Sequence, residues 1–158
     1  MSKNILIVYY SHSGNTRKLA KLIEQETGGT LFELVPEKAY PGDYNTVVEQ
    51  AKKEIQAGFR PELTTKVKDI ATYDTVFVGT PNWWSTIAPP VATFLESYDL
   101  SGKNVVPFCT HGGGGSGHIE ATVKKLCSDS TMLSLLSVYG GTVTDSQVES
   151  WLKKIGVK

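Results

Sequence analysis

Residues 5–17 read Ile-Leu-Ile-Val-Tyr-Tyr-Ser-His-Ser-Gly-Asn-Thr-Arg, an apolar run that changes abruptly into small and polar residues. A helical pattern follows at once, with Leu19, Leu22 and Ile23 on one face. A continuously apolar run is typical of a parallel strand that helices cover on both sides. The segment therefore predicts a buried strand over Ile5–Tyr9, then a polar turn, then a helix.

The turn between this strand and this helix is rich in hydroxyl and amide groups, which come from Ser11, Ser13, Asn15 and Thr16. The first N–H groups of a helix have no partner within the helix, and the helix dipole favours an anion there. We therefore predict a phosphate-binding turn. The alternative is a loop that only caps the helix, because Ser and Asn also do this without a ligand.

Four further apolar runs alternate with amphipathic segments along the chain. The runs predict strands over Leu31–Val35, Thr75–Val78, Val105–Cys109 and Met132–Val138. Between and after them, apolar residues recur at the spacing of a stripe that a helix buries against a sheet. These stripes are Val48/Ala51/Ile55, Val91/Phe94/Leu95/Tyr98, Ile119/Val123/Leu126/Cys127 and Val148/Trp151/Leu152/Ile155. The alternation predicts an α/β fold with a doubly wound parallel sheet, in a single domain over residues 1–158.

Two features oppose this prediction. Pro107 lies inside the fourth run, although a proline cannot donate a hydrogen bond to a sheet and is normally confined to strand ends or edges. Residues 36–67 are also long for a crossover connection, with turn-like sequences before and after their helix.

The composition indicates a cytoplasmic protein that binds neither nucleic acid nor membrane. Sixteen basic and sixteen acidic residues cancel, so no overall field attracts a polyanion. The sequence has no signal-peptide pattern and no apolar run as long as a membrane span. Cys109 and Cys127 form no Cys-x-x-Cys motif, which favours a reducing compartment.

Ligands of an open parallel sheet bind beyond the carboxyl ends of its strands. The loop after the third predicted strand contains Trp83 and Trp84, and large aromatic rings there offer a stacking face for a planar ligand. Because adjacent residues of an extended chain point opposite ways, one tryptophan could face the ligand while the other anchors the loop. The alternative is that both are core anchors.

The loop after the fourth predicted strand contains Gly112–Gly115, which lets the backbone approach a ligand closely. The alternative is a flexible surface loop. Other chemistry finds little support. The chain has neither a P-loop nor a Gly-x-Ser-x-Gly elbow, and its histidines and cysteines lack metal-ligand spacing. We predict no metal site and no catalytic side chain.

These loops resemble those of the flavodoxin family over essentially the whole chain, most specifically in Ser11-His12-Ser13-Gly14-Asn15-Thr16. Thr80–Trp84, Phe94–Tyr98 and Pro107–Thr110 further resemble a bacterial flavodoxin-like subgroup. The resemblance implies a three-layer α/β/α sandwich whose five-stranded parallel sheet has the order 2-1-3-4-5, and the cofactor flavin mononucleotide (FMN). It implies that the residues from Ser11 to Thr16 hold the phosphate. Along the ring and ribityl chain it places Thr80, Pro81, Asn82, Trp83 and Trp84, and at the pyrimidine edge Thr110, His111, Gly112 and Gly113.

The resulting expectation is an FMN-binding redox protein whose flavin transfers electrons to a partner protein or a small-molecule acceptor. Electron-carrier flavodoxins are usually strongly acidic and flank the flavin with aromatics from two loops. This chain is neutral and has its obvious aromatic pair in one loop. An NAD(P)H-dependent reductase of quinones or similar acceptors is therefore the alternative. A non-redox module that binds another phosphorylated ligand or a protein partner is a third hypothesis.

Overall fold

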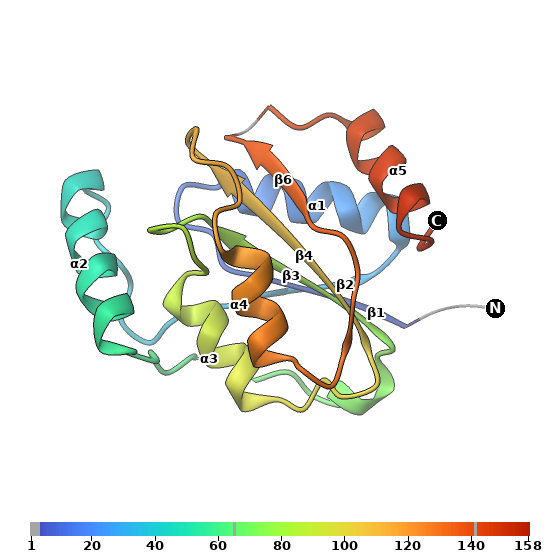
Figure 1. Ribbon diagram of the computed structural model, residues 1–158, viewed down its shortest axis with the longest axis horizontal. Helices are drawn as coiled ribbons and strands as arrows, with labels where there is room; N and C mark the ends of the chain where they lie inside the picture. The colour runs from blue at the N-terminus through green and yellow to red at the C-terminus, as the bar shows by residue number, and fades with distance from the viewer. Residues whose placement is uncertain (1–3, 65, 141) are drawn as a thin grey trace.

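The computed structural model describes residues 4–64, 66–140 and 142–158. Within them, parallel strands form a sheet in the order β2-β1-β3-β4-β5, and β6 also pairs with β4 (Figure 1). This is the predicted strand order. The strands are β1 Ile5–Tyr9, β2 Thr30–Glu33, β3 Thr75–Pro81, β4 Asn104–His111, β5 Thr131–Met132 and β6 Leu136–Tyr139.

Helices cover both faces of the sheet, as the three-layer prediction requires (Figure 1). On one face, α1 (Asn15–Thr27) and α5 (Asp145–Lys154) pack on β1, β3 and β4 around Phe77 and Phe108. On the other face, α3 (Pro89–Ser97) and α4 (Ile119–Leu126) pack around Val78 and Phe94. A short 3₁₀ turn, Ile70–Thr72, precedes β3. No helix among the described residues has the length and apolar character needed to span a membrane.

The fifth position of the sheet differs from the prediction, because two short strands replace the single run Met132–Val138. β5 pairs with Asn104 and Val105, and β6 pairs with β4 from Phe108 onward. Pro107 lies at the break between them. Leu133 N donates to Val105 O, so Val105 faces the fifth position of the sheet. Two residues further along β4, the backbone of Pro107 faces the same neighbour but has no N–H group to donate. The proline thus stays in a central strand because its neighbour on that side is interrupted.

Gly79 shows why the centre of the sheet needs a residue without a side chain. It pairs with Phe108 of β4, and a Cβ atom at Gly79 would stand 2.3 Å from the Phe108 ring. The ring therefore fills the space that a side chain on β3 would take. β1, β3, β4 and β6 all end at this edge of the sheet, at Tyr9, Pro81, His111 and Tyr139.

The helix α2 (Tyr44–Ala57) corrects one further prediction. Its stripe of Val48, Ala51 and Ile55 was expected to bury against the sheet, yet only Val47 and Ala51 are buried. α2 stands beside the carboxyl edge of the sheet and packs near α3 (Figure 1). The long segments before and after α2 permit this position, and its apolar side faces a cavity instead of strands.

Candidate functional site

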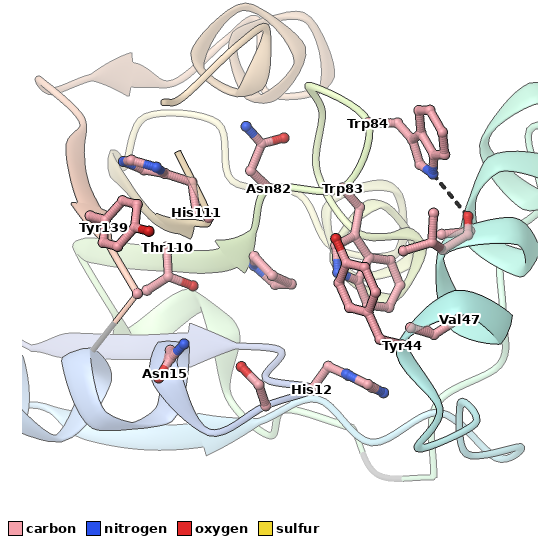
Figure 2. A pocket seen from close by; sticks show the side chains of 16 residues that line it. His12, Asn15, Tyr44, Val47, Asn82, Trp83, Trp84, Thr110, His111 and Tyr139 are labelled. Carbon is pink, nitrogen blue, oxygen red and sulfur yellow. Dashed lines mark hydrogen bonds between the residues drawn. The ribbon is translucent and has the colours of Figure 1, made fainter. Parts of the chain in front are cut away.

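A cavity of about 560 Å³ lies between α2 and the ends of β3, β4 and β6. Figure 2 shows Thr110, His111 and Tyr139 on one side of it and Tyr44 and Trp83 on the other. This is the edge at which an open parallel sheet binds ligands. The volume is within the usual range of small-molecule sites.

The cavity brings together the three loops that the sequence singles out. Ten of the fifteen predicted site residues line it: His12, Ser13, Asn15, Pro81, Asn82, Trp83, Trp84, Thr110, His111 and Gly112. The other five, which do not line it, are Ser11, Gly14, Thr16, Thr80 and Gly113. Among these, Thr80 is fully buried, and its hydroxyl accepts from Ala88 N and donates to Pro81 O. Thr80 thus fixes the start of the second loop from behind.

The first loop turns into α1 through Gly14, which has a φ of +96°. A residue with a Cβ rarely adopts this conformation. Ser11 Oγ accepts hydrogen bonds from the backbone N–H groups of Gly14 (3.1 Å) and Arg17 (3.2 Å). Ser11 therefore caps the helix, as the alternative interpretation of this loop proposed, while Ser13 and Asn15 of the same turn line the cavity.

A hydroxyl pair joins the first loop to the third. Thr16 Oγ1 and Thr110 Oγ1 are 2.7 Å apart, and both side chains are buried. When one hydroxyl donates to the other, the second keeps its own hydrogen for a further acceptor. The pair thus fixes the distance between the start of α1 and the end of β4.

The two tryptophans have different roles. Trp83 is half-buried and packs its ring edge-on against Tyr10, Tyr40 and His12. Trp84 is 49% exposed, and its Nε1 donates to Val48 O in α2 at 2.9 Å. Trp83 therefore anchors the loop, and the alternative that both tryptophans are core anchors is wrong because Trp84 is exposed. That the other tryptophan faces a ligand stays a prediction.

The turn that presents Trp84 is strained. Trp83 and Thr86 exchange two backbone hydrogen bonds of 3.1 Å, and the residues between them, Trp84 and Ser85, have φ of +56° and +65°. Left-handed backbone costs a residue with a Cβ roughly 1–2 kcal/mol. His118 N donates to Ser85 O and thereby holds the turn against the third loop.

His12 and Tyr40 tie the segment before α2 to the first loop. His12 Nε2 donates to Pro41 O at 2.8 Å, and Tyr40 Oη donates to Glu54 Oε1 of α2 at 2.5 Å. Burial, followed by the nearby Glu54 carboxylate, raises the pKa of both Tyr10 and Tyr40. Both phenols are therefore neutral at physiological pH.

Asn82 braces the second loop against the third. Its backbone N–H donates to Thr110 O (2.8 Å), and its side-chain Nδ2 donates to Gly115 O (2.6 Å). Its Oδ1 is buried and has no hydrogen-bond partner among the described residues. An unpaired buried acceptor costs about 1–3 kcal/mol.

His111 and Tyr139 form the opposite wall. His111 Nδ1 accepts the Gly113 N–H at 3.0 Å, so this nitrogen carries no proton. Tyr139 stands edge-on to the His111 ring at 5.8 Å between centroids and is 58% exposed. The end of β6 thus supplies an exposed aromatic ring to the wall.

The sequence reasoning missed Tyr44 and Tyr139, two exposed tyrosines that line the cavity. Tyr139 could have been found by applying the carboxyl-end rule to the fifth predicted strand as well as to the first, third and fourth. Tyr44 directly follows Asp43, the residue that caps α2, but its sequence gives no sign that α2 borders the cavity. Aromatic rings therefore reach this cavity from several elements, where the sequence indicated one loop.

The lining of the cavity is almost free of formal charge. None of the described residues that line it is Asp, Glu, Lys or Arg. Arg17, two residues after Asn15 in the first turn of α1, forms an ion pair with Glu33 instead. An anion at the start of α1 would therefore be held by hydroxyl, amide and backbone donors and by the helix dipole.

Cys109 lies two residues before the end of β4, beneath the third loop, and is fully buried. Its thiol donates weakly to Ser137 Oγ, and burial raises its pKa. Burial likewise raises the pKa of Cys127 to about 11. Both thiols therefore stay protonated at neutral pH, and Cys109 packs as a small buried hydrophobe.

Comparison with known proteins finds the fold described above in solved structures of flavoproteins. A candidate flavoprotein from Bacteroides eggerthii is 31% identical, with a TM-score of 0.87 over 98% of this chain and 99% of that one. A flavoprotein from Lactobacillus acidophilus, crystallised in complex with FMN, is 27% identical, with a TM-score of 0.74 over 94% of this chain and 98% of that one.

An NAD(P)H dehydrogenase (quinone) from Cupriavidus metallidurans is 32% identical over 99 residues, which are 61% of this chain and 46% of that protein. The match thus spans about half the length of this curated relative. A model of the flavodoxin family matches residues 4–155, nearly the whole chain. The chain belongs to the flavodoxin family.

Proposed function

We propose that this protein binds FMN in the cavity at the carboxyl edge of its sheet and takes part in electron transfer. One observation carries the proposal: the hydroxyl-rich turn at the start of α1 opens into the same cavity as the ends of β3 and β4. The complex of the Lactobacillus acidophilus flavoprotein with FMN supports this choice of cofactor.

The unpaired Asn82 Oδ1 tests whether FMN fits this site. A buried acceptor in the lining fits a ligand that brings an N–H group, and the isoalloxazine ring carries one. The Thr16–Thr110 pair keeps one hydroxyl hydrogen for a further acceptor, which fits a phosphate oxygen. Both observations agree with FMN.

The residues divide the work of binding. The turn from Ser11 to Thr16 would hold the phosphate with hydroxyl and backbone donors at the helix start. The loop from Thr80 to Trp84 would flank the ring and ribityl chain, and Thr110 to Gly113 would face the pyrimidine edge. FMN supplies the redox chemistry when bound, so no side chain is assigned as acid, base or nucleophile.

The visible absorption spectrum tests the cofactor assignment. Purified protein is mixed with FMN, desalted and scanned. We expect the bands of a protein-bound oxidised flavin at about one per chain. A colourless protein after desalting would remove the FMN assignment and favour the hypothesis of a non-redox phosphoryl-ligand module.

A second candidate function is NAD(P)H-dependent reduction of quinones. The partial match to the quinone dehydrogenase favours it, and so does the neutral net charge, because the chain lacks an overall negative charge that would attract a basic redox partner. Steady-state oxidation of NADPH by the FMN-loaded protein with an added quinone separates the two candidates. Rapid turnover identifies a reductase, and its absence identifies an electron carrier that needs a partner protein.

A further inference from the structure

The cavity has a polar half and an apolar half. Thr110, His111 and Asn15 lie in the polar half, and the apolar half lies between α2 and the Trp83–Trp84 turn (Figure 2). The residues predicted to bind FMN come from the loops after β1, β3 and β4. None of them comes from α2, which nevertheless contributes Tyr44, Val47, Val48 and Ala51 to the lining.

Residues of α2 that line the cavity, together with Trp84, form what we call the α2 wall: Tyr44, Val47, Val48 and Trp84. They are apolar or aromatic, and the Tyr44 ring among them is exposed to water. Tyr44 is 76% exposed, although leaving its apolar ring surface in water costs about 25 cal/mol per Å². Val48 is half-buried beside it, and Trp84 closes the wall with an indole that is 49% exposed. The Tyr44 ring therefore offers a face to a planar aromatic ligand, whereas the Lys52 ammonium lies over the Trp84 ring, 5.3 Å from its centre.

Polar contacts help to hold this wall in place beside the sheet. Trp84 Nε1 donates to Val48 O, and Tyr40 Oη donates to Glu54 Oε1. Asp43 Oδ2 accepts from the Thr46 N–H (2.9 Å) and from the Thr46 hydroxyl (2.7 Å) at the start of the helix. The strained backbone of Trp84 thus occurs at the residue whose indole fixes the position of α2.

The lining of the wall indicates the charge of the ligand. The described residues that line the apolar half carry no charge that would replace the water of an ion, and the Lys52 ammonium stands over the Trp84 ring without belonging to the lining. A dinucleotide carries a pyrophosphate, so this half suits a neutral molecule better than it suits NAD(P)H. The hydroxyl of Tyr44 adds a hydrogen-bond donor for a carbonyl group.

We propose that the α2 wall, formed by Tyr44, Val47, Val48 and Trp84, is a second binding site beside the flavin, for an uncharged planar aromatic acceptor of the quinone class. Tyr44 and Val48 then set acceptor specificity. The inference rests on the proposed function, because it places the acceptor beside bound FMN.

Equilibrium dialysis with two quinones tests the site on FMN-loaded protein. The first probe, 2,3-dimethyl-1,4-naphthoquinone, is neutral and has no free ring position for a thiol to attack. The second, 2-hydroxy-3-methyl-1,4-naphthoquinone, has a similar ring system and is an anion at neutral pH. We expect the neutral probe to bind at least tenfold tighter than the anionic one.

Three variants and a control place the probe on α2. Val48→Asp adds a carboxylate to the wall and is expected to weaken binding of the neutral probe at least tenfold. Tyr44→Ala removes a ring that is largely exposed, so folding should be little affected. This variant should weaken binding of the neutral probe about fivefold, while Tyr44→Phe should keep most of the wild-type affinity. Gln56→Asp adds the same charge on an exposed position of α2 outside the cavity lining and should change nothing.

The FMN dissociation constant of each variant is measured first, because it separates the two proposals. A wild-type protein that does not bind FMN overturns the proposed function, and this inference with it. FMN bound normally without any binding of the neutral quinone overturns the inference alone. So does a loss of FMN affinity in Val48→Asp and Tyr44→Ala equal to their loss of quinone affinity, because α2 would then hold the flavin itself.

Discussion

α1 and α2 border the same cavity but are held in place by different forces. α1 buries Leu19, Ala20 and Ile23 completely against β1 and β3, and its first turn projects into the polar half of the cavity. α2 buries only Val47 and Ala51, and side-chain hydrogen bonds fix it beside the sheet. The comparison teaches that apolar burial positions the phosphate side of the site, whereas a few polar contacts position the acceptor side.

The largest expected difference between the helices is in global stability. Leu19→Ala removes a fully buried side chain of α1 and should lower the free energy of unfolding by about 2–5 kcal/mol. Ile55→Ala, on the half-buried face of α2, should cost on the order of 1 kcal/mol or less. Urea unfolding curves measure both changes. Equal losses would mean that α2 belongs to the core as fully as α1 does.

Thr16→Ala tests the phosphate side. The substitution removes a hydroxyl next to the start of α1 and leaves Thr110 without its partner. Loss of a hydrogen bond to a charged group should weaken FMN binding by about 1.5–3 kcal/mol. Titration of flavin fluorescence measures this change, and Thr16→Ser, which keeps the hydroxyl, serves as the control. An unchanged affinity in the alanine variant would contradict the assignment of Thr16.

Trp84→Phe tests the acceptor side with a smaller effect. The phenyl ring keeps much of the aromatic surface but cannot donate to Val48 O, which should cost about 0.5–1.5 kcal/mol. Because this hydrogen bond is made to α2 and not to α1, amide hydrogen exchange should accelerate in α2 and stay constant in α1. The variant should also alter the fluorescence of bound flavin more than the thermal midpoint. A collapse of the thermal midpoint with flavin binding intact would place Trp84 in the core.

The caps of the two helices should respond differently to acid. Hydrogen bonds from the Thr46 hydroxyl and N–H lower the pKa of the Asp43 carboxyl. The stabilisation that this cap gives is therefore present above the unfolded-state pKa of Asp43 and is lost as the pH falls through its lower folded-state value. The start of α1 is capped by the Ser11 hydroxyl, which does not titrate in this range.

Amide exchange of Thr46, corrected for the intrinsic pH dependence, measures the loss of the α2 cap. We expect exchange to accelerate as Asp43 is protonated, and Asp43→Asn should abolish this pH dependence. A pH dependence that persisted in Asp43→Asn would show that another group controls the start of α2.

The sequence predicts most of the fold and one half of the site. The run Ile5–Tyr9, the turn after it and the stripe of Leu19 and Ile23 are local signals, so β1 and α1 follow from short-range rules. The position of α2 does not, because Val48 and Trp84 are separated by 36 positions and only the folded chain brings them together. The break at Pro107 is equally non-local, since it depends on the neighbouring strand.

Binding of FMN compared with binding of riboflavin tests the central claim most directly. The two ligands share the isoalloxazine ring and differ by the phosphate, which the turn at the start of α1 is proposed to hold. Titration of the flavin-free protein with each ligand should give at least a hundredfold tighter binding of FMN, and Thr16→Ala should narrow the ratio. Equal dissociation constants for the two ligands would contradict the claim that this turn is a phosphate site.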